Sequence, residues 1–113
     1  MKEELGNCYQ VAGNMILNDG IPGLVLCHGY PFSPSKGRRI RHAWCELGDV
    51  VFDFSNEKEV VTRKEIYYEI GKLNERFISR YSEKEAKELM LETGHYGDWL
   101  SESERKKMLS DIN

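Results

Sequence analysis

Apolar residues near the start of the chain recur at helical spacing. Within residues 8–18 the apolar face consists of Val11, Ala12, Met15 and Ile16. The run Asn18-Asp19-Gly20 contains residue types that end helices. The pattern therefore predicts a helix over residues 8–18.

The chain then changes to patterns that are typical of strands. Residues 24–30 form a short apolar run, as expected of a buried strand. Residues 31–37 are rich in Pro, Ser and Gly and predict a loop. Residues 38–47 alternate between polar and apolar positions, and Gly48-Asp49 predicts a two-residue turn into a returning strand over residues 50–54. We expect a strand followed by an antiparallel hairpin.

The second half of the chain is helical in pattern. Three Ser or Thr residues are each followed by a Glu at the spacing of a capping box: Thr62 and Glu65, Ser82 and Glu85, Ser101 and Glu104. An apolar stripe at helical spacing follows the first box and consists of Ile66, Ile70, Leu73 and Phe77. Gly94 is placed to end the second helix. We therefore expect two to three C-terminal helices.

Together these elements favour a single α+β domain over residues 1–113. We expect an N-terminal helix that packs on a small antiparallel sheet of about three strands, with the C-terminal helices after it. The chain is 40% hydrophobic and 31% charged, which is ordinary for a globular protein. In this scheme residues 7–55 form the core that carries the candidate chemistry, and residues 62–113 form a helical remainder.

The charge balance limits the expected partners. A net charge of −3 gives no reason to expect a nucleic acid or a membrane surface. One basic cluster, Lys36-Gly37-Arg38-Arg39-Ile40-Arg41, is either a solvated loop that enters a strand or a contact for an acidic partner. The sequence has no run of about 18 apolar residues and no apolar signal segment after Met1-Lys2-Glu3-Glu4. We expect a cytoplasmic protein, and its three cysteines fit that compartment as free thiols.

Cys8 lies at the predicted start of the first helix. Asn7 is a good N-cap residue, and Gln10 follows it at the spacing of a capping box. The unpaired N–H groups and the positive end of the helix dipole favour a thiolate there, and the same N–H groups can stabilise an oxyanion. Cys8 is therefore a candidate nucleophile; the alternative is a small buried apolar residue.

His42 and Asp53 are predicted to lie together on the hairpin. If Gly48-Asp49 is a two-residue turn, Leu47 pairs with Val50, Cys45 with Phe52, Trp44 with Asp53 and His42 with Ser55. His42 and Asp53 are then diagonal neighbours on one face, which lets the carboxylate orient the imidazole. Trp44 can shield the pair from water, and Glu46 is either a second polar support or a solvent-facing edge residue.

This segment resembles a known family pattern. His42-Ala43-Trp44-Cys45-Glu46, followed by Val51-Phe52-Asp53, is similar to the His-x-Trp-x-Glu…Asp segment of transglutaminase-like and other papain-like cysteine enzymes. In that superfamily the Cys begins a helix, and the His and Asp or Asn come from neighbouring antiparallel strands. The resemblance covers residues 7–55, and small phage and bacterial proteins of unknown role carry a similar layout.

The resemblance implies a papain-like core and acyl-transfer chemistry at an amide or ester carbonyl. Cys8 would be the nucleophile, His42 the base and Asp53 the orienting group. Residues expected to contact the substrate are Asn7, Gln10, Trp44, His28 and Trp99. The substrate would be a protein or a small amide or ester, and the reaction hydrolysis, deamidation or transamidation.

Two further groups of residues contain chemically versatile side chains. Zinc is bound by the residue types found at Cys27, His28, His42 and Cys45. Side chains alternate along a strand, however, so Cys27 and His28 face opposite sides, and so do His42 and Cys45. We therefore expect no metal and no cofactor, with His28 as a second candidate base. The segment 93–99 predicts a compact loop, whose aromatic residues either pin the tail to the core or rim the pocket.

Two functions remain open at this point. The first is a cysteine hydrolase or acyltransferase that uses Cys8, His42 and Asp53. The second is a non-catalytic binding protein on the same fold, such as a small phage protein that sequesters a host factor or a small ligand. The oligomeric state is not predicted.

Overall fold

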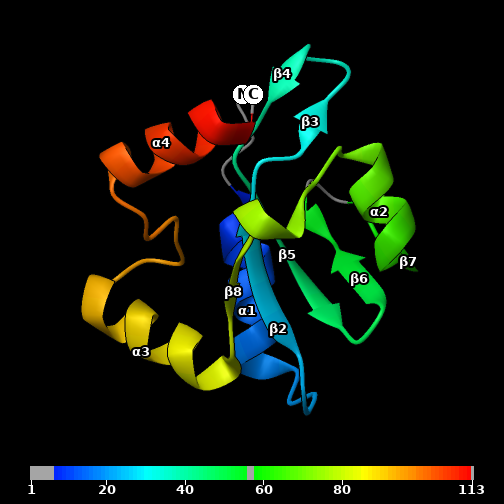
Figure 1. Cartoon of the computed structure of the whole chain (residues 1–113). Coiled ribbons are helices and arrows are strands. Elements are labelled where there is room, and N and C mark those ends of the chain that lie inside the picture. The colour runs from blue at the N-terminus through cyan, green and yellow to red at the C-terminus, as the bar shows by residue number, and fades with distance from the viewer. Residues whose placement is uncertain (1–6, 56–57, 113) are drawn as a thin grey trace.

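Five antiparallel strands form the central sheet of the molecule (Figure 1). The computed structural model describes residues 7–55 and 58–112. In sheet order the strands are β7 (Val60–Arg63), β6 (Val50–Asp53), β5 (His42–Leu47), β2 (Val25–Gly29) and β8 (Ser79–Tyr81). A separate small sheet pairs β3 (Phe32–Ser33) with β4 (Arg38–Arg39).

Helices lie before and after these strands in the chain. The described residues form α1 (Asn7–Asn18), α2 (Lys64–Ile70), α3 (Glu83–Thr93) and α4 (Glu102–Ile112), with a short 3₁₀ helix η2 at Glu75–Phe77. The predicted α+β class with an antiparallel sheet is confirmed.

Helix α1 covers one face of the sheet. Its apolar stripe packs on strand residues of β2 and β5 and on α3, in a cluster made of Ala12, Met15, Ile16, Leu24, Leu26, Ala43, Cys45 and Ala86. The opposite face carries Cys27, Trp44 and Val51, and side chains of α2 and the following segment pack against it. The sheet therefore has an apolar core on both sides.

The hairpin turn that the site depends on has the predicted register. Leu47 pairs with Val50 and Cys45 with Phe52, so Gly48-Asp49 is the two-residue connection. Gly48 adopts a φ of 58°, a left-handed value that glycine accommodates without a steric penalty. Because the register holds, His42 and Asp53 project from the same face of the sheet.

The prediction for residues 62–113 was wrong in two places, since two strands of the sheet come from that half. Thr62 lies in β7, where it pairs with Val51, and the capping box with Glu65 is not formed. Helix α2 instead starts at Lys64, and Ile66 and Ile70 of the expected apolar stripe are exposed. Pairing of the β-branched run over residues 60–62 with β6 overrides the local helix signal.

The predictions for the other two capping boxes and for the end of α3 are confirmed. Ser82 and Glu85 form a reciprocal capping box, and Ser101 and Glu104 exchange the same two hydrogen bonds. Gly94 ends α3 in the left-handed conformation. The strand predicted over residues 38–47 is divided into β4 and β5, and part of the predicted loop before it pairs as β3.

Candidate active site

Cys8 lies in the first turn of α1, with a side chain that is 4% exposed. The helix begins at Asn7, so Asn7 is a helical residue and not the N-cap that the sequence predicted. The shift is one position, and Cys8 keeps its place among the N–H groups that have no partner within the helix. The nucleophile candidate is thus at a helix N-terminus, as expected.

His42 and Asp53 form the closest charged contact of this region. Nε2 of His42 lies 2.8 Å from Oδ2 of Asp53. His42 opens β5 and Asp53 closes β6, so the pair lies at one end of the hairpin. This contact commits Nε2 to the carboxylate and leaves Nδ1 as the ring nitrogen that is available to another group.

Two side chains from outside the predicted trio hold the Asp53 carboxylate. The Tyr67 hydroxyl donates to Oδ2 at 2.7 Å, and the Ser55 hydroxyl donates to Oδ1 at 2.8 Å. Burial raises the pKa of Asp53, but hydrogen bonds and the charge of His42 outweigh it, and the pKa falls to about 2. The carboxylate is therefore ionised and fixed in orientation.

Cys8 and Asp53 act together on the pKa of His42. Burial lowers this pKa, whereas hydrogen bonds to Asp53 and Cys8 raise it, and the result is a pKa of about 9. The Cys8 thiol therefore acts on the same ring that Asp53 holds through Nε2. The three groups that the sequence singled out lie in one cluster, in the order thiol, imidazole, carboxylate.

Trp44 supports this cluster from inside the core. Its side chain is fully buried and stacks beside His42, with ring centroids 6.3 Å apart. Its Nε1 donates to Oε2 of Glu46 at 2.9 Å. No surface of the ring is accessible, which agrees with the shielding role, and the contact between Trp44 and substrate stays a prediction.

Glu46 is buried, 3% exposed, and is the second polar support rather than an edge residue. The Tyr68 hydroxyl donates to the same carboxylate oxygen that accepts from Trp44. Lys64 and Arg80 lie 3.7 and 3.6 Å from the other oxygen. The charge is therefore compensated, as a buried carboxylate requires.

His28 lies on the opposite face of the sheet from His42. Among the described residues neither ring nitrogen has a hydrogen-bond partner, and the ring is 5% exposed. Three aromatic rings surround it, those of Tyr9, Tyr81 and Trp99, with centroid distances of 4.8, 5.2 and 5.0 Å. Burial lowers its pKa to about 4. His28 is a core residue on the face of the sheet opposite to His42, and its role as a second base or as a substrate contact stays a prediction.

The segment 93–99 pins the tail to the body of the domain. The Tyr96 hydroxyl donates to Asn14 of α1 at 3.1 Å, and Trp99 packs beside His28 while its Nε1 donates to Thr93. Gly97 lies so close to His28 that a Cβ there would be 2.5 Å from the ring. Trp99 therefore packs against the core. The other two predicted substrate contacts lie at the start of α1, where Asn7 is half-buried and Gln10 is exposed.

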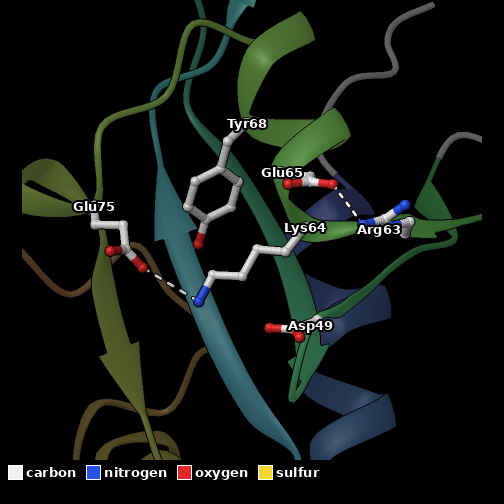
Figure 2. A pocket seen from close by; sticks show the side chains of 6 residues that line it. All are labelled: Asp49, Arg63, Lys64, Glu65, Tyr68 and Glu75. Carbon is white, nitrogen blue, oxygen red and sulfur yellow. Dashed lines mark ion pairs between the residues drawn. The ribbon is translucent and has the colours of Figure 1, made fainter.

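Figure 2 shows a hollow of about 420 Å³ on the surface. Its walls are Asp49, Arg63, Lys64, Glu65, Tyr68 and Glu75. Lys64 forms an ion pair with Glu75 at 3.2 Å across it, as Figure 2 shows. Charges of both signs neutralise one another here, and none of the three catalytic candidates contributes to the lining.

Residues 7–55 and 58–112 contain no group of three metal-binding side chains in suitable geometry. Cys27 and Cys45 lie on opposite faces of the sheet, and the Cys45 thiol donates to the Ala12 carbonyl at 3.4 Å. No helix within these residues is long and apolar enough to cross a membrane.

Sequence reasoning did not identify Tyr67 and Tyr68 as site residues. The two adjacent tyrosines of α2 donate to the buried acids Asp53 and Glu46, respectively. The available signal was the pair of hydroxyls itself, since a buried Tyr usually requires an acceptor. Ser55 was placed correctly on the hairpin face but without its role as a donor to Asp53.

Comparisons of this chain with known protein families, curated proteins and solved structures find no match. The function is therefore argued from the geometry of the site.

Proposed function

We propose that this protein is a cysteine-dependent hydrolase or acyltransferase that acts on an amide or ester carbonyl. The observation that carries the proposal is the 2.8 Å contact between His42 Nε2 and Asp53 Oδ2, beside a Cys8 thiol that raises the pKa of the same ring. A nucleophile, a base and a group that orients the base are the parts that such chemistry needs. The transglutaminase-like resemblance of residues 42–53 agrees with this assignment.

The reaction begins with transfer of the Cys8 thiol proton to His42. The sulfur then attacks the substrate carbonyl carbon, a C–S bond forms, and the electron pair of the C=O double bond moves to oxygen. N–H groups of the first turn of α1 are available to stabilise that oxyanion. The raised pKa of His42 favours the imidazolium that balances the thiolate.

Collapse of this intermediate re-forms the C=O bond and releases the amine or alcohol, which takes the proton from His42. The product is a thioester on Cys8. Water or an amine then attacks the thioester, gives its proton to His42, and expels the sulfur, which recovers the proton. Water gives hydrolysis or deamidation, and an amine gives transfer.

The first test measures alkylation of Cys8 by iodoacetamide as a function of pH, with peptide mapping by mass spectrometry. Because Cys8 is paired with His42, we expect it to react near pH 6 at least about tenfold faster than a free thiol. Cys27 and Cys45 are fully buried and serve as internal controls that stay unmodified. His42→Ala should remove the acceleration.

An unchanged alkylation rate in His42→Ala, or a Cys8 rate no higher than that of a free thiol, refutes the proposal. Asp53→Asn gives a graded control, because it keeps the size of the side chain and removes its charge. We expect its Cys8 rate to lie between those of the original protein and of His42→Ala.

One observation favours the second candidate, a binding protein without catalysis. Cys8 and His42 are 4% and 8% exposed, so a substrate reaches them only by displacing neighbouring groups. A binding function requires no reactive thiol, and Cys8→Ala would then leave the biological effect intact. Loss of that effect in Cys8→Ala and in the isosteric Cys8→Ser supports the enzyme instead.

A further inference from the structure

The hairpin of β3 and β4, residues 32–41 and here called the basic hairpin, concentrates positive charge. Four cations lie within it: Lys36, Arg38, Arg39 and Arg41. The hairpin contains no acidic residue, and because the chain carries −3 in total, the rest of the chain carries −7. The positive charge is therefore a local feature of one projecting element (Figure 1).

The cations of this hairpin are largely free to meet a partner. Lys36, Arg38 and Arg41 are exposed and form no ion pair with another described residue. Arg39 differs from these three, because it is half-buried and its guanidinium donates to the Tyr30 carbonyl at 2.8 Å. Uncompensated cations of one sign on one element attract anionic partners and steer their approach.

The hairpin is held in place. Its turn is closed by hydrogen bonds from Lys36 N and Gly37 N to the Ser33 carbonyl, at 3.2 and 2.8 Å. At its base Phe32 N donates to Gly71 O at 2.8 Å, and Lys72 lies over the Phe32 ring, 4.6 Å from the centroid. A fixed arm presents its charges at lower entropic cost than a mobile loop.

The hairpin leads directly into the candidate active site. Arg41 immediately precedes His42, and by chain length the Cα of Arg38 lies within about 14 Å of that of His42. Arg41 also acts electrostatically on Tyr9, the residue after Cys8. In Figure 1 the hairpin rises from the end of the molecule at which β5 begins.

We propose that the basic hairpin docks acidic polypeptide segments beside the Cys8 cluster and so selects substrates with Asp or Glu near the reacting carbonyl. This proposal rests on the proposed function. A polypeptide is favoured over a nucleic acid, because a charge of −7 over the rest of the chain repels the extended phosphate backbone, whereas a short acidic segment meets only the arm.

The first measurement is binding, which does not depend on turnover. Fluorescein-labelled (Gly-Glu)₄ and (Gly-Lys)₄ peptides are titrated with the Cys8→Ala protein at about 20 mM and about 200 mM salt. We expect the acidic peptide to bind at least about tenfold more tightly than the basic one at low salt, and high salt to weaken it. Equal affinities, or tighter binding of a 20-nucleotide single-stranded DNA than of the acidic peptide, overturn the proposal.

Charge reversal tests the arm itself. Lys36→Glu/Arg38→Glu should weaken binding of the acidic peptide at least about tenfold. Lys84→Glu is the matched control, because Lys84 is exposed on α3 and forms no ion pair with another described residue. The affinity of Lys84→Glu for the acidic peptide should stay within about twofold of that of the unmodified protein. A reversal variant that binds as the control does refutes the assignment of the arm.

The second measurement connects the arm to Cys8. Saturating (Gly-Glu)₄ should slow alkylation of Cys8 by iodoacetamide at least about fivefold, and it should not do so in Lys36→Glu/Arg38→Glu. If the peptide binds but does not slow alkylation of Cys8, it binds away from Cys8, and the proposal is overturned. Failure of the proposed function has a different signature, in which Cys8 shows no raised reactivity in the absence of peptide. In that case the titration of the labelled peptides still decides whether the arm docks acidic segments.

Discussion

His42 and His28 lie on neighbouring strands of one sheet and are buried to similar extents, yet their pKa values move in opposite directions. His42 contacts Asp53, Cys8 also raises its pKa, and that pKa is about 9. His28 has no hydrogen-bond partner among the described residues and has a pKa of about 4. Burial lowers both values, so the partners account for the difference.

The strand register places the two imidazole rings in different surroundings. His28 pairs with Ala43, the residue after His42, so the two imidazoles face opposite sides of the sheet. One side offers a carboxylate and a thiol, and the other offers the rings of Tyr9, Tyr81 and Trp99. A buried histidine is thus a candidate for chemistry only when its partners are known.

The largest expected effect comes from making His42 resemble His28. Asp53→Ala leaves His42 buried without its carboxylate, and we expect a loss of about 3 kcal/mol in unfolding free energy at pH 7, measured in urea. The pKa of His42, followed by NMR, should fall from about 9, because burial is then opposed only by the contribution of Cys8. Asp111→Ala, at an exposed acid of α4, is the control and should change stability by less than about 0.5 kcal/mol. Equal losses in the two variants would show that the pair does not stabilise the fold.

The next prediction concerns acid and tests His28. Its pKa is lowered from 6.5 to about 4, so the unfolded chain binds its proton more readily than the folded protein. Stability should therefore fall by about 3 kcal/mol as pH drops from 6.5 through 4. His28→Phe removes this group and should flatten the dependence over that window, as measured by urea unfolding at several pH values. An unchanged slope contradicts the assignment of the window to His28.

The opposite window belongs to His42. Its pKa is raised from 6.5 to about 9, so its contribution is complete below pH 6.5 and is lost as pH rises through 9. We expect a loss of about 3 kcal/mol over this range that is absent in His42→Phe. The two histidines then give stability curves that bend at opposite ends of the pH scale. A bend that persists in His42→Phe would have to come from another group.

The sequence predicted the site better than it predicted the sheet around it. Gly48-Asp49 and the alternation on either side of it depend on local chemistry, and they were sufficient to place His42 beside Asp53. Strands β7 and β8 are short, and they form because β6 and β2 offer free edges, which no local pattern reports. The β-branched run Val60-Val61-Thr62 was the available signal for β7.

The sequence favoured His42 over His28 as the base only through the local hairpin signal that places Asp53 beside His42. Both are flanked by strand-like residues, and the partners of each come from distant segments. Tyr67 reaches Asp53 from α2, and Trp99 reaches His28 from the segment before α4. Such contacts exist only after the chain has packed, so only the local part of the site, Asp53 beside His42, was accessible to pattern reasoning.

The smallest predicted effect refines the comparison at the Asp53 carboxylate. Tyr67→Phe removes one donor from Oδ2 and leaves His42 and Ser55 in place, so we expect a loss of about 1 kcal/mol. Because that hydrogen bond lowers the pKa of Asp53, the pKa should rise in the variant, as followed by NMR of the side-chain carboxyl carbon. Tyr68→Phe is the matched control, since it removes the equivalent donor from Glu46 and should leave the pKa of Asp53 unchanged. If the pKa of Asp53 is the same in the two variants, the carboxylate is held by His42 and Ser55 alone. The distinction between the two histidines then rests on a single ion pair.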